Sequence, residues 1–306
     1  MRYRRVLVLV AVVAPVLAAG TASAVVPVKV RATLRLEIQP AALIDHLAYS
    51  EAPRAQPTRF NLFVKPTTAA RFRVNPAGTV AFTSGSIDGT TLVFWQRTLL
   101  GLGQIKFLDL ISRVVTNPPA GVNTPRHETN PELSGEWLAF TRSFRRALSS
   151  PRRLILHHLT DSSQRLLDVG TDAYVQSGGL AGNYVAWTRC RFLNRCNSWL
   201  YDIAAANKRR LPNPLGRSQF AVSVTSDGTV YYAESGTILC APRKIVRFWR
   251  QPLVGARQFI GRLARGRDTA VTSPVLLADG GVEVFFDRFD CRTGAADLYK
   301  FVIPPP

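Results

Sequence analysis

The sequence contains none of the short motifs that mark common enzyme active sites. There is no Gly-x-Ser-x-Gly nucleophile elbow, which argues against a serine hydrolase domain. His127-Glu128 begins a zinc-protease pattern, but the second histidine is missing and Pro131 would interrupt the helix that the pattern requires. Cysteine and histidine are scarce, with four of each, and no Cys-x-x-Cys pair is present. We therefore expect no catalytic residues of these types, no metal site and no cofactor.

Acidic residues are also few. The chain of 306 residues has 20 Asp plus Glu against 39 Lys plus Arg, which gives a formal net charge of +19. With 46% hydrophobic and 19% charged residues the composition is that of a globular protein, which excludes collagen and coiled coil. No long segment keeps the apolar i, i+3, i+4 spacing of an amphipathic helix, which disfavours helical solenoids.

The first 24 residues predict a cleaved secretory signal peptide. Residues 1–5 are basic, residues 6–19 are apolar, and residues 21–24 (Thr-Ala-Ser-Ala) fit a signal peptidase site. The apolar run of 14 residues contains Pro15 and is shorter than the roughly 20 residues that span a bilayer. Cleavage would remove Arg2, Arg4 and Arg5 and lower the net charge from +19 to +16. We expect an extracytoplasmic protein, secreted or in the periplasm or cell-wall space, without a transmembrane segment.

A short phrase recurs along the chain: a turn that contains glycine, then an apolar residue, a small or aromatic residue, and an aromatic residue. Five copies stand out and a sixth lacks the glycine; they are residues 77–83, 134–141, 181–188, 227–233, 279–286 and 45–50. Each copy is typical of a tight turn that leads into a buried strand, because glycine tolerates positive φ. Further strand-like runs follow each copy, so the repeating unit contains several antiparallel strands.

The aromatic residue of each phrase marks the period of the repeat. These markers are Tyr49, Phe82, Phe140, Trp187, Tyr232 and Phe286. Their spacings are 33, 58, 47, 45 and 54 residues, with a mean of about 47. A period of this size with four short strands predicts an all-β fold, a six-bladed β-propeller of four-stranded antiparallel blades.

Residues 130–141 (Asn-Pro-Glu-Leu-Ser-Gly-Glu-Trp-Leu-Ala-Phe-Thr), followed in the next unit by Leu200-Tyr201-Asp202-Ile203, resemble the TolB-like six-bladed β-propeller repeat. In that family a Pro-x-x-Ser-Pro-Asp-Gly turn leads to an apolar-Ala-Phe strand and then to a Leu-Tyr strand. The Ser-Pro-Asp-Gly turn occurs here in altered forms, such as residues 225–228 (Thr-Ser-Asp-Gly). The resemblance covers most of the chain after residue 24 and implies one propeller domain over residues 25–306.

The beginning of that domain is expected to close the ring. Residues 28–38 alternate like a half-buried strand, whereas the last unit ends at Ile303 without an outermost strand. We expect part of residues 28–38 to pair with the last blade and so remove an exposed sheet edge.

All four cysteines lie after residue 24, and their even number suggests disulfides in an oxidising compartment. Cys190 and Cys196 flank one expected hairpin, while Cys240 and Cys291 follow corresponding strands of neighbouring units. Three connectivities are possible, and we favour Cys190–Cys196 and Cys240–Cys291.

The other polar residues are interpreted first as structural. His157 and His158 are adjacent on an expected strand and should face opposite sides, one toward the core. His46 could face a central channel, although a core or surface position is favoured. Asp88, Asp227 and Asp279 each precede a glycine in a turn, where an aspartate caps the backbone.

The basic excess is concentrated in arginine clusters at expected hairpin tips and outer strands. One interpretation is a solvated rim that maintains solubility. The alternative is a patch that binds anionic envelope polymer, lipid headgroups or another envelope protein; its candidate residues are Arg191, Arg195, Arg209, Arg210, Lys244 and Arg247. Export makes intracellular nucleic acid an unsuitable partner.

The function that these observations favour is a secreted or envelope-associated, non-enzymatic binding or scaffolding protein. The alternative is an exported lyase or hydrolase with its site at the mouth of the propeller channel. Carboxylates or histidines that converge at that mouth would favour the enzyme.

Overall fold

The structure is a computed structural model that describes residues 24–31, 33, 35–82, 85–98, 101–144, 151–170, 173–191 and 195–305. The segment 1–23, which holds nearly all of the expected signal peptide, lies outside these residues. The described residues form strands, turns and loops and contain no helix. No helix long and apolar enough to cross a membrane occurs among them.

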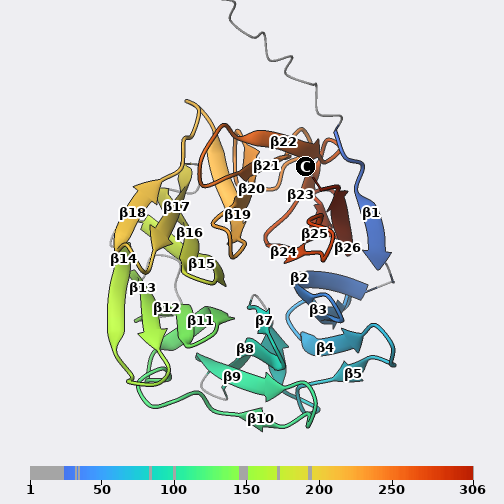
Figure 1. The fold of residues 1–306 in the computed structure, drawn as a ribbon. Coiled ribbons are helices and arrows are strands. Elements are labelled where there is room, and N and C mark those ends of the chain that lie inside the picture. The colour runs from blue at the N-terminus through green and yellow to red at the C-terminus, as the bar shows by residue number, and fades with distance from the viewer. Residues whose placement is uncertain are drawn as a thin grey trace, which may run out of the picture.

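Six antiparallel sheets are arranged around a central axis, which confirms the six-bladed β-propeller (Figure 1). Blade 1 contains β2 (Arg35–Leu43), β3 (His46–Pro53), β4 (Asn61–Pro66) and β5 (Phe72–Arg73). Blade 2 contains β6 (Val80–Phe82), β7 (Ile87–Asp88), β8 (Thr91–Arg97), β9 (Gly103–Asp109) and β10 (Val115–Thr116). Blade 3 contains β11 (His127–Ser134), β12 (Trp137–Ser143), β13 (Arg152–His158) and β14 (Gln164–Gly170).

The second half of the ring repeats this order. Blade 4 contains β15 (Ala173–Ala181), β16 (Tyr184–Arg191), β17 (Cys196–Asp202) and β18 (Asn207–Arg210). Blade 5 contains β19 (Ser218–Val224), β20 (Val230–Ser235), β21 (Arg247–Gln251) and β22 (Gln258–Arg262). Blade 6 contains β23 (Arg267–Asp268), β24 (Thr272–Leu276), β25 (Val282–Asp290), β26 (Ala296–Ile303) and β1 (Val28–Arg31).

In blade 2 the marker residue predicted from the repeat was wrong. Within the phrase at residues 77–83, residues 80–82 form β6, part of a split innermost strand, whereas the other phrases lead into the second strand of their blades. The second strand of blade 2 is β8, which follows the turn at Gly89. Phe82 is therefore the wrong marker, and Phe94 is the equivalent residue. With Phe94 the spacings become 45, 46, 47, 45 and 54 residues.

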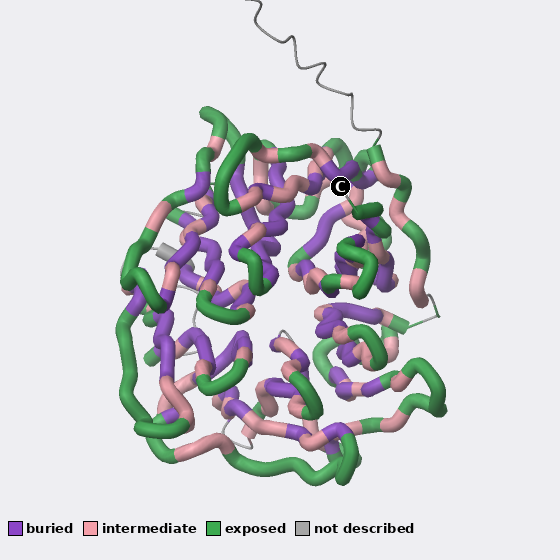
Figure 2. The backbone as a smooth tube through the Cα atoms, in the orientation of Figure 1, coloured by how far each residue is buried: buried purple, intermediate pink, exposed green. Residues whose placement is uncertain are grey.

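The repeated aromatic residues form the core between blades. The six corrected markers are all among the largest fully buried side chains, namely Tyr49, Phe94, Phe140, Trp187, Tyr232 and Phe286. Figure 2 shows buried segments gathered in the strands and exposed segments in the loops at the rim. Each blade packs between two neighbouring blades, so its second strand is apolar on both faces. This explains why the alternation of apolar and polar residues is weak in that strand.

The ring closes through the N-terminal strand, as expected from the sequence. β1 pairs antiparallel with β26, with Val28 opposite Lys300, and supplies the outermost strand of blade 6. The chain then enters β2, the innermost strand of blade 1. Both favoured disulfides are also confirmed: Cys190–Cys196 closes the β16–β17 hairpin, and Cys240–Cys291 joins blades 5 and 6.

Candidate functional site

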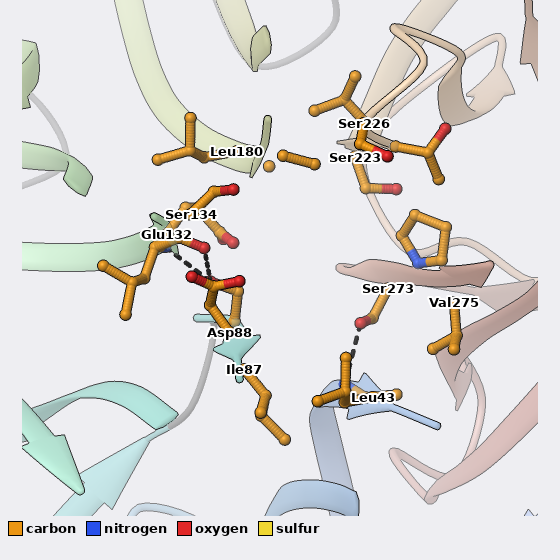
Figure 3. Close-up of a pocket in the computed structure, with 18 of the residues that line it drawn as sticks. Leu43, Ile87, Asp88, Glu132, Ser134, Leu180, Ser223, Ser226, Ser273 and Val275 are labelled. Atoms are coloured by element: carbon orange, nitrogen blue, oxygen red, sulfur yellow. Dashed lines mark hydrogen bonds between the residues drawn. The ribbon is translucent and has the colours of Figure 1, made fainter. Parts of the chain in front are cut away.

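The propeller has two faces that differ in their loops. The end at which a turn connects each innermost strand to the second strand is called the cavity face. The opposite end, where the second strand connects to the third, is called the hairpin face. At the cavity face the innermost strands surround a central cavity of about 270 Å³. Strands of all six blades line it, and its walls carry serine and threonine hydroxyls among aliphatic side chains (Figure 3).

Two carboxyl groups line this cavity, Asp88 and Glu132. Asp88 is engaged structurally, because its Oδ2 accepts a hydrogen bond from the Gly135 amide at 2.7 Å and so joins blades 2 and 3. Glu132 is only 7% exposed, and burial raises the pKa of its carboxyl well above the usual value. Two carboxyl groups therefore converge at the mouth, but one is already used by the fold.

Two of the three turn aspartates cap their own turns as the sequence predicts, whereas Asp88 binds an amide of the next blade. Asp227 Oδ1 accepts the Thr229 amide at 3.0 Å, and Asp279 Oδ1 accepts the Gly281 amide at 2.8 Å. Burial acts to raise the pKa of Asp227, but hydrogen bonds from the Thr225 hydroxyl and from the Thr229 amide and hydroxyl together lower it below the usual value. Both residues cap turns at the cavity face.

None of the four histidines lines the cavity. His46 contacts Asp45 with 2.7 Å between Nδ1 and Oδ1, and His127 Nδ1 accepts the Gly103 amide at 2.6 Å. His157 is fully buried and His158 is half-buried beside the Trp137 ring, which confirms that the adjacent pair faces opposite sides. The candidate site therefore lacks a histidine base among the described residues.

The candidate arginines of blade 4 lie at the hairpin face and along its outer edge. Arg191 and Arg195 flank the Cys190–Cys196 hairpin, and the Arg191 amide donates to the Arg195 carbonyl at 2.9 Å. Both side chains are exposed. Arg209 and Arg210 lie on β18, the outermost strand of the same blade; Arg210 is exposed and Arg209 is half-buried.

In blade 5 only one of the two candidate cations is accessible. Arg247 begins β21, is half-buried, and lies opposite Arg262 on β22. Lys244 is buried, and its Nζ is 2.7 Å from Asp268 Oδ1. Burial lowers the pKa of Lys244, and the same desolvation raises the pKa of Asp268. Including Lys244 in an anion-binding set was therefore wrong, because its charge is enclosed by the junction of blades 5 and 6.

Sequence reasoning left out a basic group that the second disulfide assembles. The Cys291 amide donates to the Gly266 carbonyl, and the Gly266 amide donates to the Lys244 carbonyl, so three loops meet beside the Cys240–Cys291 bond. They carry Arg243, Arg265, Arg267 and Arg292. Arg267 pairs with Asp290, while Arg243, Arg265 and Arg292 are exposed. The cysteine pairing was the available signal, since it predicts that these loops meet.

One group of possible metal ligands occurs in the described part of the chain. It consists of Cys240, Asp268 and Cys291. The two sulfur atoms are bonded to each other and so offer no thiolate, while Asp268 pairs with Lys244. This group is a disulfide beside a buried ion pair.

Comparison with known proteins gives the fold. No family model matches the chain, and no curated protein matches it. Among solved structures, TolB from Acinetobacter baumannii matches with a TM-score of 0.56 and 11% identity, over 84% of this chain and 63% of that chain. A structure described as TolB from Agrobacterium tumefaciens matches with a TM-score of 0.60 and 10% identity, over 89% and 92% of the two chains.

Peptidases are also similar in fold. A Mycobacterium tuberculosis peptidase that hydrolyses puromycin matches with a TM-score of 0.52 and 12% identity, over 86% of this chain and 52% of that chain. This chain thus corresponds to about half of that peptidase. At these identities the likeness establishes a TolB-like propeller fold and nothing about ligand or activity.

Proposed function

We propose that this protein is an extracytoplasmic, non-enzymatic binding protein whose hairpin face recognises an anionic component of the cell envelope. The observation that carries the proposal is the set of arginines around two disulfide-tied loops on one face. These are Arg191, Arg195, Arg209, Arg210 and Arg247 in blades 4 and 5. Their neighbours Arg243, Arg265 and Arg292 extend the positive charge toward blade 6.

The physical basis is long-range attraction. Arginine keeps its charge and presents planar donors that match phosphate and carboxylate oxygens. Side chains exposed to water interact over a Debye length of about 8 Å at physiological salt, so several of them must act together. The two disulfides fit an oxidising compartment, and the sequence of residues 1–24 has the pattern of a secretory signal peptide.

The enzyme alternative depends on the cavity. A lyase or hydrolase would need a second free acid or base beside Glu132. Among the described lining residues the second carboxyl belongs to Asp88, which accepts the Gly135 amide. This arrangement supports the binding protein over the enzyme.

The test is co-sedimentation with phosphatidylglycerol vesicles, phosphatidylcholine vesicles and isolated cell wall. The variant replaces the five arginines, Arg191, Arg195, Arg209, Arg210 and Arg247, by glutamine. The matched control removes five exposed cations from blades 1 and 2, at Arg54, Arg59, Lys65, Arg97 and Arg113. It therefore has the same net charge as the test variant.

We expect wild type and control to bind phosphatidylglycerol vesicles or cell wall at low salt and to dissociate as salt rises. The five-arginine variant should bind at least tenfold more weakly. Binding to cell wall alone would identify a polymer as the anion, and binding to vesicles alone would identify lipid headgroups. Equal loss in both variants would show that net charge alone matters, and would contradict the proposed site.

A further inference from the structure

The cavity at the centre of the propeller differs in charge from the rest of the molecule. The chain has about twice as many basic as acidic residues. No Lys, Arg or His is found among the described residues that line the cavity, whereas Asp88 and Glu132 are. The turns around the mouth carry further acids, Asp45, Glu136, Asp227 and Asp279, all exposed. A strongly basic protein thus presents a negative opening on its axis.

Glu132 occupies a position that repeats around the ring. The equivalent positions are found from the second strand of each blade. The residue that directly precedes the buried marker aromatic on that strand pairs with one residue of the innermost strand. The six innermost-strand residues defined in this way are Ala41, Ser86, Glu132, Gly179, Ser223 and Ser273. Five of the six are small. The sixth, Glu132, has an ionisable side chain. The five small residues show that blades pack at this position without one.

The serines at this position connect neighbouring blades. The Ser86 hydroxyl accepts the Leu133 amide at 2.7 Å, and the Ser273 hydroxyl accepts the Ala42 amide at 3.0 Å. The Ser223 hydroxyl lies 2.7 Å from that of Thr272. Each of these bonds reaches the innermost strand of the next blade.

Glu132 makes no such connection. It lies on the face of β11 that packs toward blade 4, since it pairs with Ala139, which belongs to that core. Two amides of blade 4 instead bind other residues of blade 3: Ser177 donates to Thr141 and Gly182 donates to Ser134. No hydrogen bond or ion pair holds the Glu132 carboxyl within the described chain. At the equivalent position of blade 4, Gly179 packs directly against the backbone of Ser223 and Val224 in blade 5.

We propose that the central cavity binds a primary ammonium group on a slim chain, such as a lysine side chain or the amino terminus of a partner peptide, with Glu132 as its counter-ion. An ammonium group has three donors and needs three acceptors. Figure 3 shows Glu132, Ser134 and Asp88 on one wall facing Ser223, Ser226 and Ser273 on the other. The carboxyl and the hydroxyl oxygens of this ring supply acceptors of that kind.

The lining favours an organic monocation over a metal ion. Calcium takes six to eight oxygen ligands and tight sites use several carboxylates. Here one carboxyl is available, because Asp88 is held by Gly135. The aliphatic side chains of Leu43, Leu180 and Val275 also line the cavity and suit the carbon chain that would carry the ammonium group.

Burial of the Glu132 carboxyl favours the binding of a cation beside it. Desolvation by burial raises the pKa of Glu132, and no positive charge among the described residues offsets it. A buried carboxyl in this state is stabilised in its charged form by an opposite charge that enters the same site.

The experiment measures binding of n-butylammonium to the full protein by titration NMR, with n-butanol as the uncharged match and calcium as a competing cation. The test variant is Glu132→Gln, and the control is Glu136→Gln, which removes the same charge from the cavity face at an exposed position. Ser226→Arg is a second variant, because Ser226 is exposed at the cavity rim and an added guanidinium there would repel a cation. Circular dichroism checks that each variant folds.

We expect wild type and Glu136→Gln to bind n-butylammonium within twofold of each other. Glu132→Gln and Ser226→Arg should bind it at least tenfold more weakly. Equal binding of n-butanol, binding of calcium alone, or unchanged binding in Glu132→Gln would each overturn the assignment. The vesicle test on the hairpin face uses different residues, so either site can fail without the other.

Discussion

Arg31 in the closing strand binds Glu51 in blade 1, with Nη2 3.2 Å from Oε2. Glu51 is fully buried and also pairs with Arg35 and Arg71. Arg31 in addition contacts Glu37, which is equally buried. β1 is thus fixed twice, by its backbone to β26 and by its charge to blade 1, and the ring closes through both.

Deleting residues 24–31 should therefore open the ring. The deletion exposes the edge of β26 and leaves Glu37 and Glu51 with fewer counter-charges in a buried position. We expect the melting temperature to fall by about 5 °C, since roughly 3 kcal/mol corresponds to that shift in a chain of this size. Removing the three C-terminal prolines, which follow β26, is the control. An unchanged melting temperature after the N-terminal deletion would refute closure by β1.

The two disulfides should differ in their contribution to stability. Cys240–Cys291 closes a loop with a sequence separation of 51, against 6 for Cys190–Cys196. Loop entropy then predicts a loss of about 4 kcal/mol for the double serine variant of the longer loop and about 2 kcal/mol for the shorter. Denaturant unfolding without reductant measures both. If the shorter loop contributed more, chain entropy would not be the source of the stabilisation.

Glu132 should make the free energy of unfolding depend on pH. Because burial raises its pKa in the folded state above the unfolded value near 4.5, the group contributes nothing when both states are protonated. Stability is lost as pH rises through the unfolded pKa, since the unfolded chain then ionises more easily. Glu132→Gln should thus be as stable as wild type near pH 4 and more stable at pH 7. Denaturant unfolding at both pH values measures this, and a variant less stable at pH 7 would show that the carboxyl serves the fold.

The repeat and its period could be predicted from the sequence because one strand in each blade is squeezed between two neighbours. That constraint selects an aromatic residue five positions after a glycine in four of the blades, as in Gly135 and Phe140, or Gly182 and Trp187. Gly89 and Phe94 have the same spacing, but the phrase at residues 77–83 looks similar and misled the assignment. Local residue patterns do not distinguish the innermost strand from the second.

The candidate site was less predictable because it depends on register between blades. In the sequence Lys244 looks like one member of a basic cluster, and only the fold shows that Asp268 lies beside it and pairs with it. Glu132 reads as part of a turn phrase, and its isolation becomes visible only when the six innermost strands are compared position by position. Arginines at hairpin tips could be predicted, since both cysteine pairs mark the loops that carry them.

The two proposed binding sites have opposite charge and lie on opposite faces of one propeller. The most direct test measures both ligands on both variants: anionic vesicles or cell wall, and n-butylammonium. The five-arginine variant should lose the anionic partner and keep n-butylammonium within twofold, and Glu132→Gln should do the reverse. Loss of both ligands in either variant, or of neither in both, would contradict the separation of the two sites.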